Sequence, residues 1–165
     1  MLFRSERLRQ RGTAAHNTVT VDGQDSSEVW GGFRVARRAH PQCLEASSGP
    51  DALRVSCAHD GYARLPGRPA HRRTWELGER SLRIVDEAPR ARAARSHWHW
   101  APGIEPADPS RIALADGRAL RVEVDGGAWS SAPSTWHPEF GLVVSNASSA
   151  ADFAGSRCTV TISWT

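Results

Sequence analysis

The sequence predicts an all-β fold, an antiparallel β-sandwich of about nine or ten strands. Short segments alternate apolar and polar side chains with the period of a half-buried strand. Turn residues, mostly Asp and Gly, separate these segments. Helical patterns are nearly absent: the one stretch of helix-friendly composition, residues 88–95, contains Pro89 and lacks a helical period.

The expected strands follow one another along the whole chain. The best-defined pair is a hairpin, because residues 73–77 and 82–86 both alternate and a short connection beginning with Gly78 joins them. Residues 47–51 and 102–110 are expected to be surface loops. The expected strands are 18–22, 33–37, 53–57, 73–77, 82–86, 111–114, 120–124, 141–144 and 158–164.

Length and charge limit the class of protein. The chain has 165 residues, about the size of one domain, and we treat residues 1–165 as one unit. It carries 21 basic residues, all of them arginine, against 18 acidic ones, a net charge of +3. That charge is too small to indicate nucleic acid. No stretch approaches the ~18 apolar residues that a membrane helix needs. We therefore expect neither nucleic acid nor a membrane as a partner.

Cysteine usage and the missing motifs exclude further classes. Cys43, Cys57 and Cys158 are odd in number and lack C-x-x-C spacing, which disfavours a zinc finger or a disulfide framework. One pair remains able to form a bridge in an oxidising compartment. The basic segment 4–11 has no apolar run behind it, so it does not resemble a secretory signal. Motifs of hydrolase elbows and nucleotide sites are absent.

A cluster of polar residues precedes the first expected strand. His16 and Asn17 are adjacent there, and Arg11 lies a few residues upstream. A histidine at such a position can bind a metal ion or move a proton, and it can equally satisfy a loop carbonyl. The residues alone leave these interpretations open.

A second histidine pair also has two interpretations. His97 and His99 are two residues apart, so on a strand they share one face and could form a metal pair. The alternative is a strand with one polar face, with Trp98 and Trp100 on the opposite face.

Arginines and tryptophans supply the candidate sugar contacts. Arg72 and Arg73 are able to grip a carboxylate or sulfate, or they are solvated strand residues. Trp129 and Trp136 lie among Gly, Ser and Pro, where we expect turns, and are the better candidates for stacking on a sugar ring. The tryptophans expected in the core are Trp30, Trp75, Trp98 and Trp164.

Several separated motifs agree with one family. The run RGTAAHNTVTVDGQDSSEVWGGFRVARRAHP, residues 11–41, resembles the start of the C-terminal region of heparinase II/III-like proteins, which are bacterial polysaccharide lyases and their relatives. Residues 59–62 are similar to the family's HDGY stretch. Residues 71–73 and 82–86 are similar to its HRR hairpin, and residues 136–141 to its late aromatic turn. The resemblance covers nearly the whole chain.

The resemblance implies a fold, an activity and a partner domain. Family members join an N-terminal α/α toroid to a C-terminal antiparallel β-sandwich. They cleave uronic-acid-containing polysaccharides by β-elimination, in which a base removes the proton beside the carboxylate and an acid protonates the leaving oxygen. The toroid is absent from this sequence, so we expect a lyase fragment that is inactive alone. Relatives often act in the periplasm or outside the cell.

The resemblance also implies a metal. His16 matches a position that in some members binds a structural zinc ion, together with a histidine from an H-x-H motif and an aspartate, both upstream. Those partners are missing here, and one histidine cannot hold Zn²⁺. We therefore expect zinc only in a full-length protein, with none bound by this chain alone.

Two functional hypotheses follow. The first is the C-terminal β domain of a polysaccharide lyase, with Arg11, Asn17, Arg72, Arg73, Trp129 and Trp136 toward an acidic polysaccharide and His16 toward the metal. The alternative is a non-catalytic carbohydrate-binding or structural β-sandwich.

Overall fold

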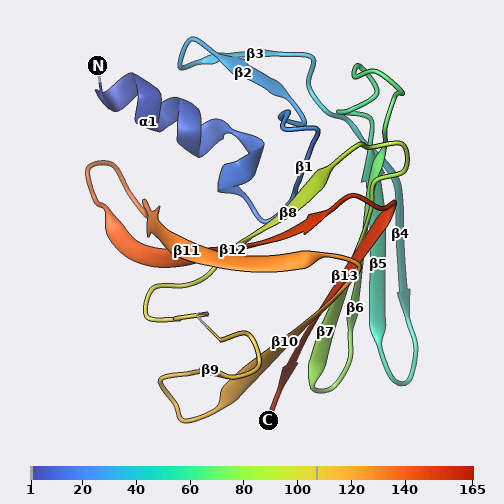
Figure 1. Cartoon of the computed structure of the whole chain (residues 1–165), viewed down its shortest axis with the longest axis vertical. Helices are drawn as coiled ribbons and strands as arrows, with labels where there is room; N and C mark the ends of the chain where they lie inside the picture. The colour runs from blue at the N-terminus through green and yellow to red at the C-terminus, as the bar shows by residue number, and fades with distance from the viewer. Residues whose placement is uncertain (1, 107) are drawn as a thin grey trace.

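The expected antiparallel β-sandwich is confirmed. The computed structural model describes residues 2–106 and 108–165, with side chains from residue 5 onward. Within this part of the chain, thirteen strands form a four-stranded sheet, a seven-stranded sheet and a small two-stranded ribbon. The two large sheets face each other, and the N-terminal helix lies beside the four-stranded sheet (Figure 1).

The four-stranded sheet has the order β1-β8-β12-β11. All its pairings are antiparallel, and Thr20 pairs with Arg95 where β1 meets β8. Side chains alternate along β8: Ser96 and Trp98 are buried, whereas His97 and His99 are partly exposed. The strands are β1 (Val19–Val21), β8 (Ala94–His99), β12 (Val144–Phe153) and β11 (Ala128–Trp136).

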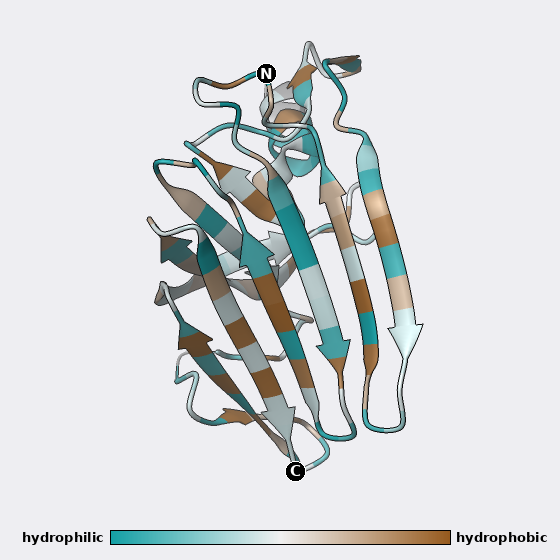
Figure 2. Ribbon diagram, turned by 90° about the vertical axis from the view of Figure 1, so that its right-hand side faces the viewer, coloured by the Kyte–Doolittle hydropathy of each residue, from teal (hydrophilic) through white to brown (hydrophobic). Residues whose placement is uncertain are grey.

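The seven-stranded sheet has the order β4-β5-β6-β7-β13-β10-β9. The predicted hairpin is present, because β6 and β7 pair from Arg72–Glu87 to Leu77–Leu82. Figure 2 shows hydrophobic and hydrophilic residues alternating along its strands, as a half-buried sheet requires. The strands are β4 (Pro41–Ser48), β5 (Leu53–His59), β6 (His71–Leu77), β7 (Ser81–Glu87), β13 (Arg157–Trp164), β10 (Ala119–Asp125) and β9 (Ile112–Ala113).

The basic N-terminal segment is helical, which the sequence analysis missed. Helix α1 covers Leu2–Arg11, and the short 3-10 helix η1 covers Thr13–Ala15. Glu6 binds Arg9 and Gln10, three and four residues further on, which are neighbours on a helix surface. Contacts with the ribbon β2 (Glu28–Trp30) and β3 (Arg34–Ala36) secure the helix from outside. No helix in the described residues is long and apolar enough to cross a membrane.

Four strands, β2, β4, β8 and β11, had no counterpart among the expected strands, and one expected strand was misplaced. For β8 the sequence offered only the open possibility that His97 and His99 share one face of a strand. β4 and β11 are exposed edge strands rich in Ser and Ala, so they carry no apolar alternation to detect. β2 has only three residues. The expected strand at 141–144 is wrong: Gly141 adopts a positive φ in a turn, and β12 begins only at Val144.

The core lies between the two large sheets. It contains Val19, Trp98 and Phe153 from the smaller sheet and Ile84 and Val160 from the larger. Tyr62 is also fully buried and donates a hydrogen bond to the Val19 carbonyl. These contacts hold β1, and therefore the segment just before it, against the sandwich.

Candidate functional site

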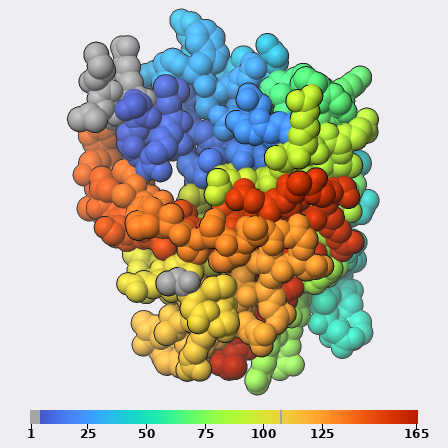
Figure 3. Space-filling view, in the orientation of Figure 1, coloured from blue at the N-terminus to red at the C-terminus, as the bar shows by residue number. Residues whose placement is uncertain are grey.

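A cleft lies between helix α1 and the end of the four-stranded sheet. It has a volume of about 330 Å³, and Figure 3 shows the hollow between α1 and strands β11 and β12. Three histidines from distant parts of the chain meet here. We call it the histidine cleft; it is lined by Arg9, Gln10, Ala15, His16, His99, Thr135, Trp136, His137 and Asn146.

Hydrogen bonds to strand β8 fix the segment that carries His16 at one edge of the cleft. The Asn17 side-chain oxygen accepts a hydrogen bond from the His99 backbone N–H at 2.7 Å. The His99 ring Nε2 lies 3.0 Å from the Ala14 carbonyl. The Thr18 carbonyl accepts from the His97 N–H at 2.8 Å. His16 itself is exposed, so its imidazole faces the cleft without a role in the core.

An ion-pair cluster forms the opposite side of the cleft. Arg9 pairs with Glu6 at 2.5 Å and donates to the Thr135 hydroxyl at 3.0 Å. His137 Nε2 lies 3.2 Å from a Glu6 carboxylate oxygen. Hydrogen bonds from Arg9 and Gln10 lower the pKa of Glu6 to about 2. The carboxylate is therefore ionised at neutral pH and offsets the Arg9 charge, so this side is polar rather than strongly positive.

Small side chains continue the cleft across the outer face of the sheet. A shallow hollow of about 140 Å³ adjoins it, floored by His97, His99 and several Ser and Ala residues of β11 and β12. Burial, followed by the nearby Arg95 charge, lowers the pKa of His97 to about 4. His97 is therefore neutral at pH 7, with its Nε2 2.9 Å from the Thr20 hydroxyl.

The predicted arginine contacts do not meet in this cleft. Arg73 is only 5% exposed, so it is not a solvated strand residue, and it binds Asp86 through two nitrogens, at 2.7 and 2.8 Å. Arg72 is half-buried on β6 and donates to the Ser56 hydroxyl. Arg11 reaches away from His16 to the Gly32 carbonyl at 2.6 Å. Arg9 is the arginine that lines the cleft.

The predicted tryptophan contacts are separated by the pleat of one strand. Trp129 and Trp136 both lie on β11 rather than in turns. Trp129 packs against the core, 6.1 Å from the Trp98 ring centroid. Trp136 is 48% exposed and lines the cleft. Trp30, expected in the core, is 50% exposed on the β2–β3 ribbon and stacks with Arg34.

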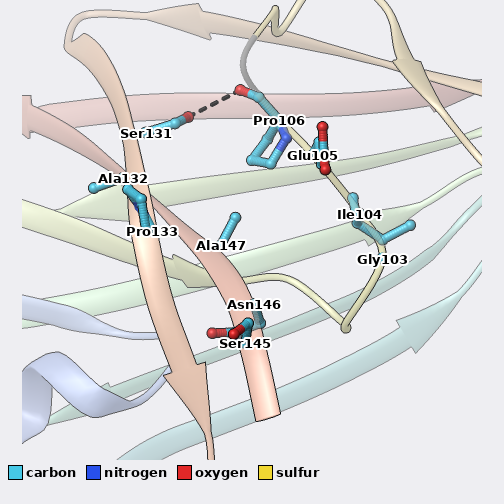
Figure 4. Close-up of a pocket in the computed structure, with 10 residues that line it drawn as sticks. All are labelled: Gly103, Ile104, Glu105, Pro106, Ser131, Ala132, Pro133, Ser145, Asn146 and Ala147. Atoms are coloured by element: carbon cyan, nitrogen blue, oxygen red, sulfur yellow. Dashed lines mark hydrogen bonds between the residues drawn. The ribbon is translucent and has the colours of Figure 1, made fainter.

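A second cavity, of about 360 Å³, opens between strands β11–β12 and the loop that carries Ile104 and Pro106 (Figure 4). The Ser131 hydroxyl donates to the Pro106 carbonyl at 3.0 Å and closes one side. Asn146 lines both this cavity and the histidine cleft. The lining is mainly apolar, and none of the predicted site residues lies in it.

The residues present do not make a zinc site by themselves. Among the described residues, no three His, Cys, Asp or Glu side chains lie close enough together to hold a metal ion. His16, His99 and His137 line one cleft, but they are not close enough together to supply the three or four ligands that zinc requires.

Sequence reasoning missed six polar residues of the cleft: Arg9, Gln10, His99 as a cleft residue, Thr135, His137 and Asn146. Arg9 was detectable, since its spacing from Glu6 suits a helical ion pair. His99 and His137 were visible in short motifs, but nothing local places them beside His16. Their meeting depends on the pairing of β8, β12 and β11.

By its fold and its cleft, the protein is an antiparallel β-sandwich domain with a polar groove on its surface. The sequence matches the family described as heparinase II/III-like, C-terminal, over residues 4–165, and the chain belongs to this family. No curated protein matches the sequence significantly.

Solved structures of lyases share the fold. A mutant of the heparan sulfate lyase HepC from Pedobacter heparinus has a TM-score of 0.72 and 14% identity over 99% of this chain. A heparinase III with methylated lysines has a TM-score of 0.71 and 15% identity over 98%. HepC itself has a TM-score of 0.72 and 15% identity over 97%. The chain spans about a quarter of the length of these enzymes, 26% of the first and 25% of the other two.

Proposed function

We propose that this chain works as the C-terminal β domain of a polysaccharide lyase, and that the histidine cleft contacts a uronic-acid-containing polysaccharide. Membership of the heparinase II/III-like family carries this proposal. The cleft supports it, because Trp136 offers an exposed ring and Arg9, His99 and His137 offer hydrogen-bonding groups beside it.

The chemistry of β-elimination explains why we expect the chain to be inactive alone. A base must remove the proton on the carbon next to the uronate carboxylate, which gives an enolate-like intermediate; a carbon–carbon double bond then forms as the bond to the leaving oxygen breaks and an acid protonates that oxygen. The enolate-like intermediate needs a fixed group that neutralises the carboxylate. We propose that an N-terminal α/α toroid supplies most of these groups, and that this chain lines one wall of the substrate cleft.

A zinc ion at His16 belongs to the same proposal. It would need further ligands from a segment preceding this domain in a full-length lyase, and it would hold that segment against the cleft edge.

The test uses the purified 165-residue chain and a panel of polymers: heparan sulfate, alginate and a neutral glucan as control. We expect no rise in the ultraviolet absorbance of unsaturated uronate. We also expect calorimetric binding to an acidic polymer that weakens as salt shortens the range of charge interactions. Absence of binding to every acidic polymer would overturn the cleft assignment, and a rise in absorbance would overturn the inactivity of the isolated chain.

The alternative, a carbohydrate-binding module without catalysis, rests on the exposed Trp136 beside polar groups. It predicts the same binding, but no gain of elimination when a toroid domain of a heparinase II/III-like lyase is added. Elimination that requires both polypeptides would favour the lyase.

A further inference from the structure

A fully buried polar network links the two sheets of the sandwich. Asp86 at its centre is 1% exposed, His71 3% and Arg73 5%. Asp86 accepts hydrogen bonds from Arg73, from His71 Nε2 at 2.9 Å and from the Ser96 hydroxyl at 2.8 Å. Ser96 lies on β8, so the network reaches from β6 and β7 of the larger sheet into the smaller one.

The hydrogen-bond partners determine which ring nitrogen of His59 and of His71 carries a proton. The Gly61 backbone N–H donates to His59 Nδ1 at 3.2 Å, so His59 carries its proton on Nε2. That proton points to His71 Nδ1, 3.1 Å away, and His71 therefore carries its own proton on Nε2 and donates it to Asp86. Both imidazoles are neutral, and the charge of Asp86 is balanced by Arg73.

The network is locked in this arrangement. Burial raises the pKa of Asp86, but the hydrogen bonds from His71 and Arg73 outweigh it and hold the pKa below its usual range. The two parallel nitrogen–oxygen contacts of Arg73 fix the plane of its guanidinium. Gly61 also has no room for a side chain, because a Cβ there would lie 2.5 Å from the Ser26 carbonyl.

One guanidinium nitrogen is left over, and it binds the segment that precedes β1. Arg73 Nη1 donates to the Asn17 backbone carbonyl at 2.6 Å. The side chain of Asn17 in turn accepts the His99 N–H at 2.7 Å. Asn17 therefore joins the buried network to the strand residue His99, and it is adjacent in sequence to His16.

We propose that Arg73 is a positioning residue for the histidine cleft. Its guanidinium, oriented by Asp86, sets the place of Asn17 and thereby of His16 and His99. A lysine at position 73 would keep the charge but lack the planar fork needed to bind Asp86 and the Asn17 carbonyl together. The proposal depends on the proposed function only in treating the cleft as the binding surface.

The test compares Arg73→Lys with a matched control, Arg83→Lys. Arg83 also lies on the β6–β7 hairpin and forms an ion pair, with Glu76 at 2.7 Å, but on the outer face of the sheet. We expect hydrogen exchange of the Thr18, His97 and His99 amides to accelerate roughly tenfold in Arg73→Lys, because a charge-assisted hydrogen bond to Asn17 is lost. The β10–β13 amides should keep their protection, and Arg83→Lys should change neither region.

A second variant separates positioning from stability. Replacing the network with apolar residues, in His71→Leu/Arg73→Met/Asp86→Leu, removes buried charges together, which is often neutral or stabilising. We expect this protein to keep its thermal midpoint while the Thr18 and His99 amides still exchange faster. Unchanged exchange at these amides in both variants would overturn the proposal. So would an equal acceleration in β10 and β13.

The exchange measurement needs no ligand, so it judges positioning even if the wild-type chain binds no polysaccharide. If the wild type does bind, Arg73→Lys should weaken the affinity for heparan sulfate several-fold, whereas Arg83→Lys should leave it unchanged.

Discussion

The molecule contains two histidine clusters built from the same residue types with opposite properties. In the buried network, His71 and Arg73 bind Asp86 and His59 binds His71, so their hydrogen bonds end on partners inside the protein. In the histidine cleft, His16 and His137 accompany Arg9 and Glu6; His16, Arg9 and Glu6 are open to water, and His137 is partly exposed. Breaking the first arrangement costs much free energy because its groups are buried. The second lies at the surface, where its groups can exchange their partners for a ligand.

The difference shows that residue type alone does not decide which arginine or histidine contacts a ligand. Arg73 has the chemistry to bind a carboxylate, and it does so, but the carboxylate is Asp86. Arg9 binds Glu6 at the surface, where the pair is weak and screened by salt. Burial therefore sets the free-energy cost of breaking each pair.

The largest effect is expected from removing the central carboxylate. Asp86→Ala leaves the buried Arg73 without its partner, and we expect a loss of about 3–5 kcal/mol in the free energy of unfolding, measured by urea denaturation. Glu76→Ala is the control, since Glu76 pairs with two arginines on the outer face of the same hairpin. It should cost about 1 kcal/mol or less. Equal losses in the two variants would contradict the contrast.

The second-largest effect is expected from acid, which should lower the free energy of unfolding through His59 of the buried network. Burial, followed by the influence of His71, lowers the pKa of His59 from 6.5 to about 4. The unfolded chain therefore takes up this proton at a higher pH than the native protein. The stability from His59 is fully present above pH 6.5 and is lost as the pH falls toward 4.

Between pH 7.5 and pH 5 we expect one such histidine to remove about 2 kcal/mol, read from urea midpoints at several pH values. His59→Gln should flatten this part of the curve. His97→Gln should flatten it independently, because the pKa of His97 is also lowered to about 4 and the residue lies in the other sheet. A pH dependence identical in the wild type and both variants would refute the assignment.

The smallest effect on stability is expected in the cleft, where the change should fall on binding. Trp136→Ala removes a half-exposed ring, so we expect less than about 0.5 kcal/mol in unfolding free energy. The affinity for an acidic polysaccharide should drop roughly tenfold in calorimetry. Trp30→Ala is the matched control, equally exposed but outside the cleft. Comparable losses of binding in both variants would remove Trp136 from the site.

The sandwich was predictable because alternation is a local property. The hairpin β6–β7 was recognised from two alternating arms and a glycine turn. The same reasoning missed β4 and β11, whose exposed edges need no apolar face. It also missed helix α1, whose stability depends on Arg7 and Arg11 reaching the Gly32 carbonyl in the ribbon.

The candidate site was predicted less completely, for a different reason. His16 and Trp136 were chosen from their neighbours in sequence, and the structure places both in one cleft. Trp129 was chosen by the same criterion, but the pleat of β11 turns it to the core. Successive side chains of a strand point to opposite faces, so a shift of one residue would exchange the surface ring and the buried ring. The composition of the sequence does not reveal which face a residue takes.

The sequence by itself determined the fold class, the β6–β7 hairpin and the family resemblance, because all three depend on short-range patterns and ordered motifs. Only the tertiary structure decided which polar side chains are buried and which are accessible to water. Arg73 meets Asn17 across 56 residues, and Arg9 meets His137 across 128. Such meetings depend on strand order and sheet packing, and these set burial, which decides whether a charged side chain stabilises the core or faces the cleft.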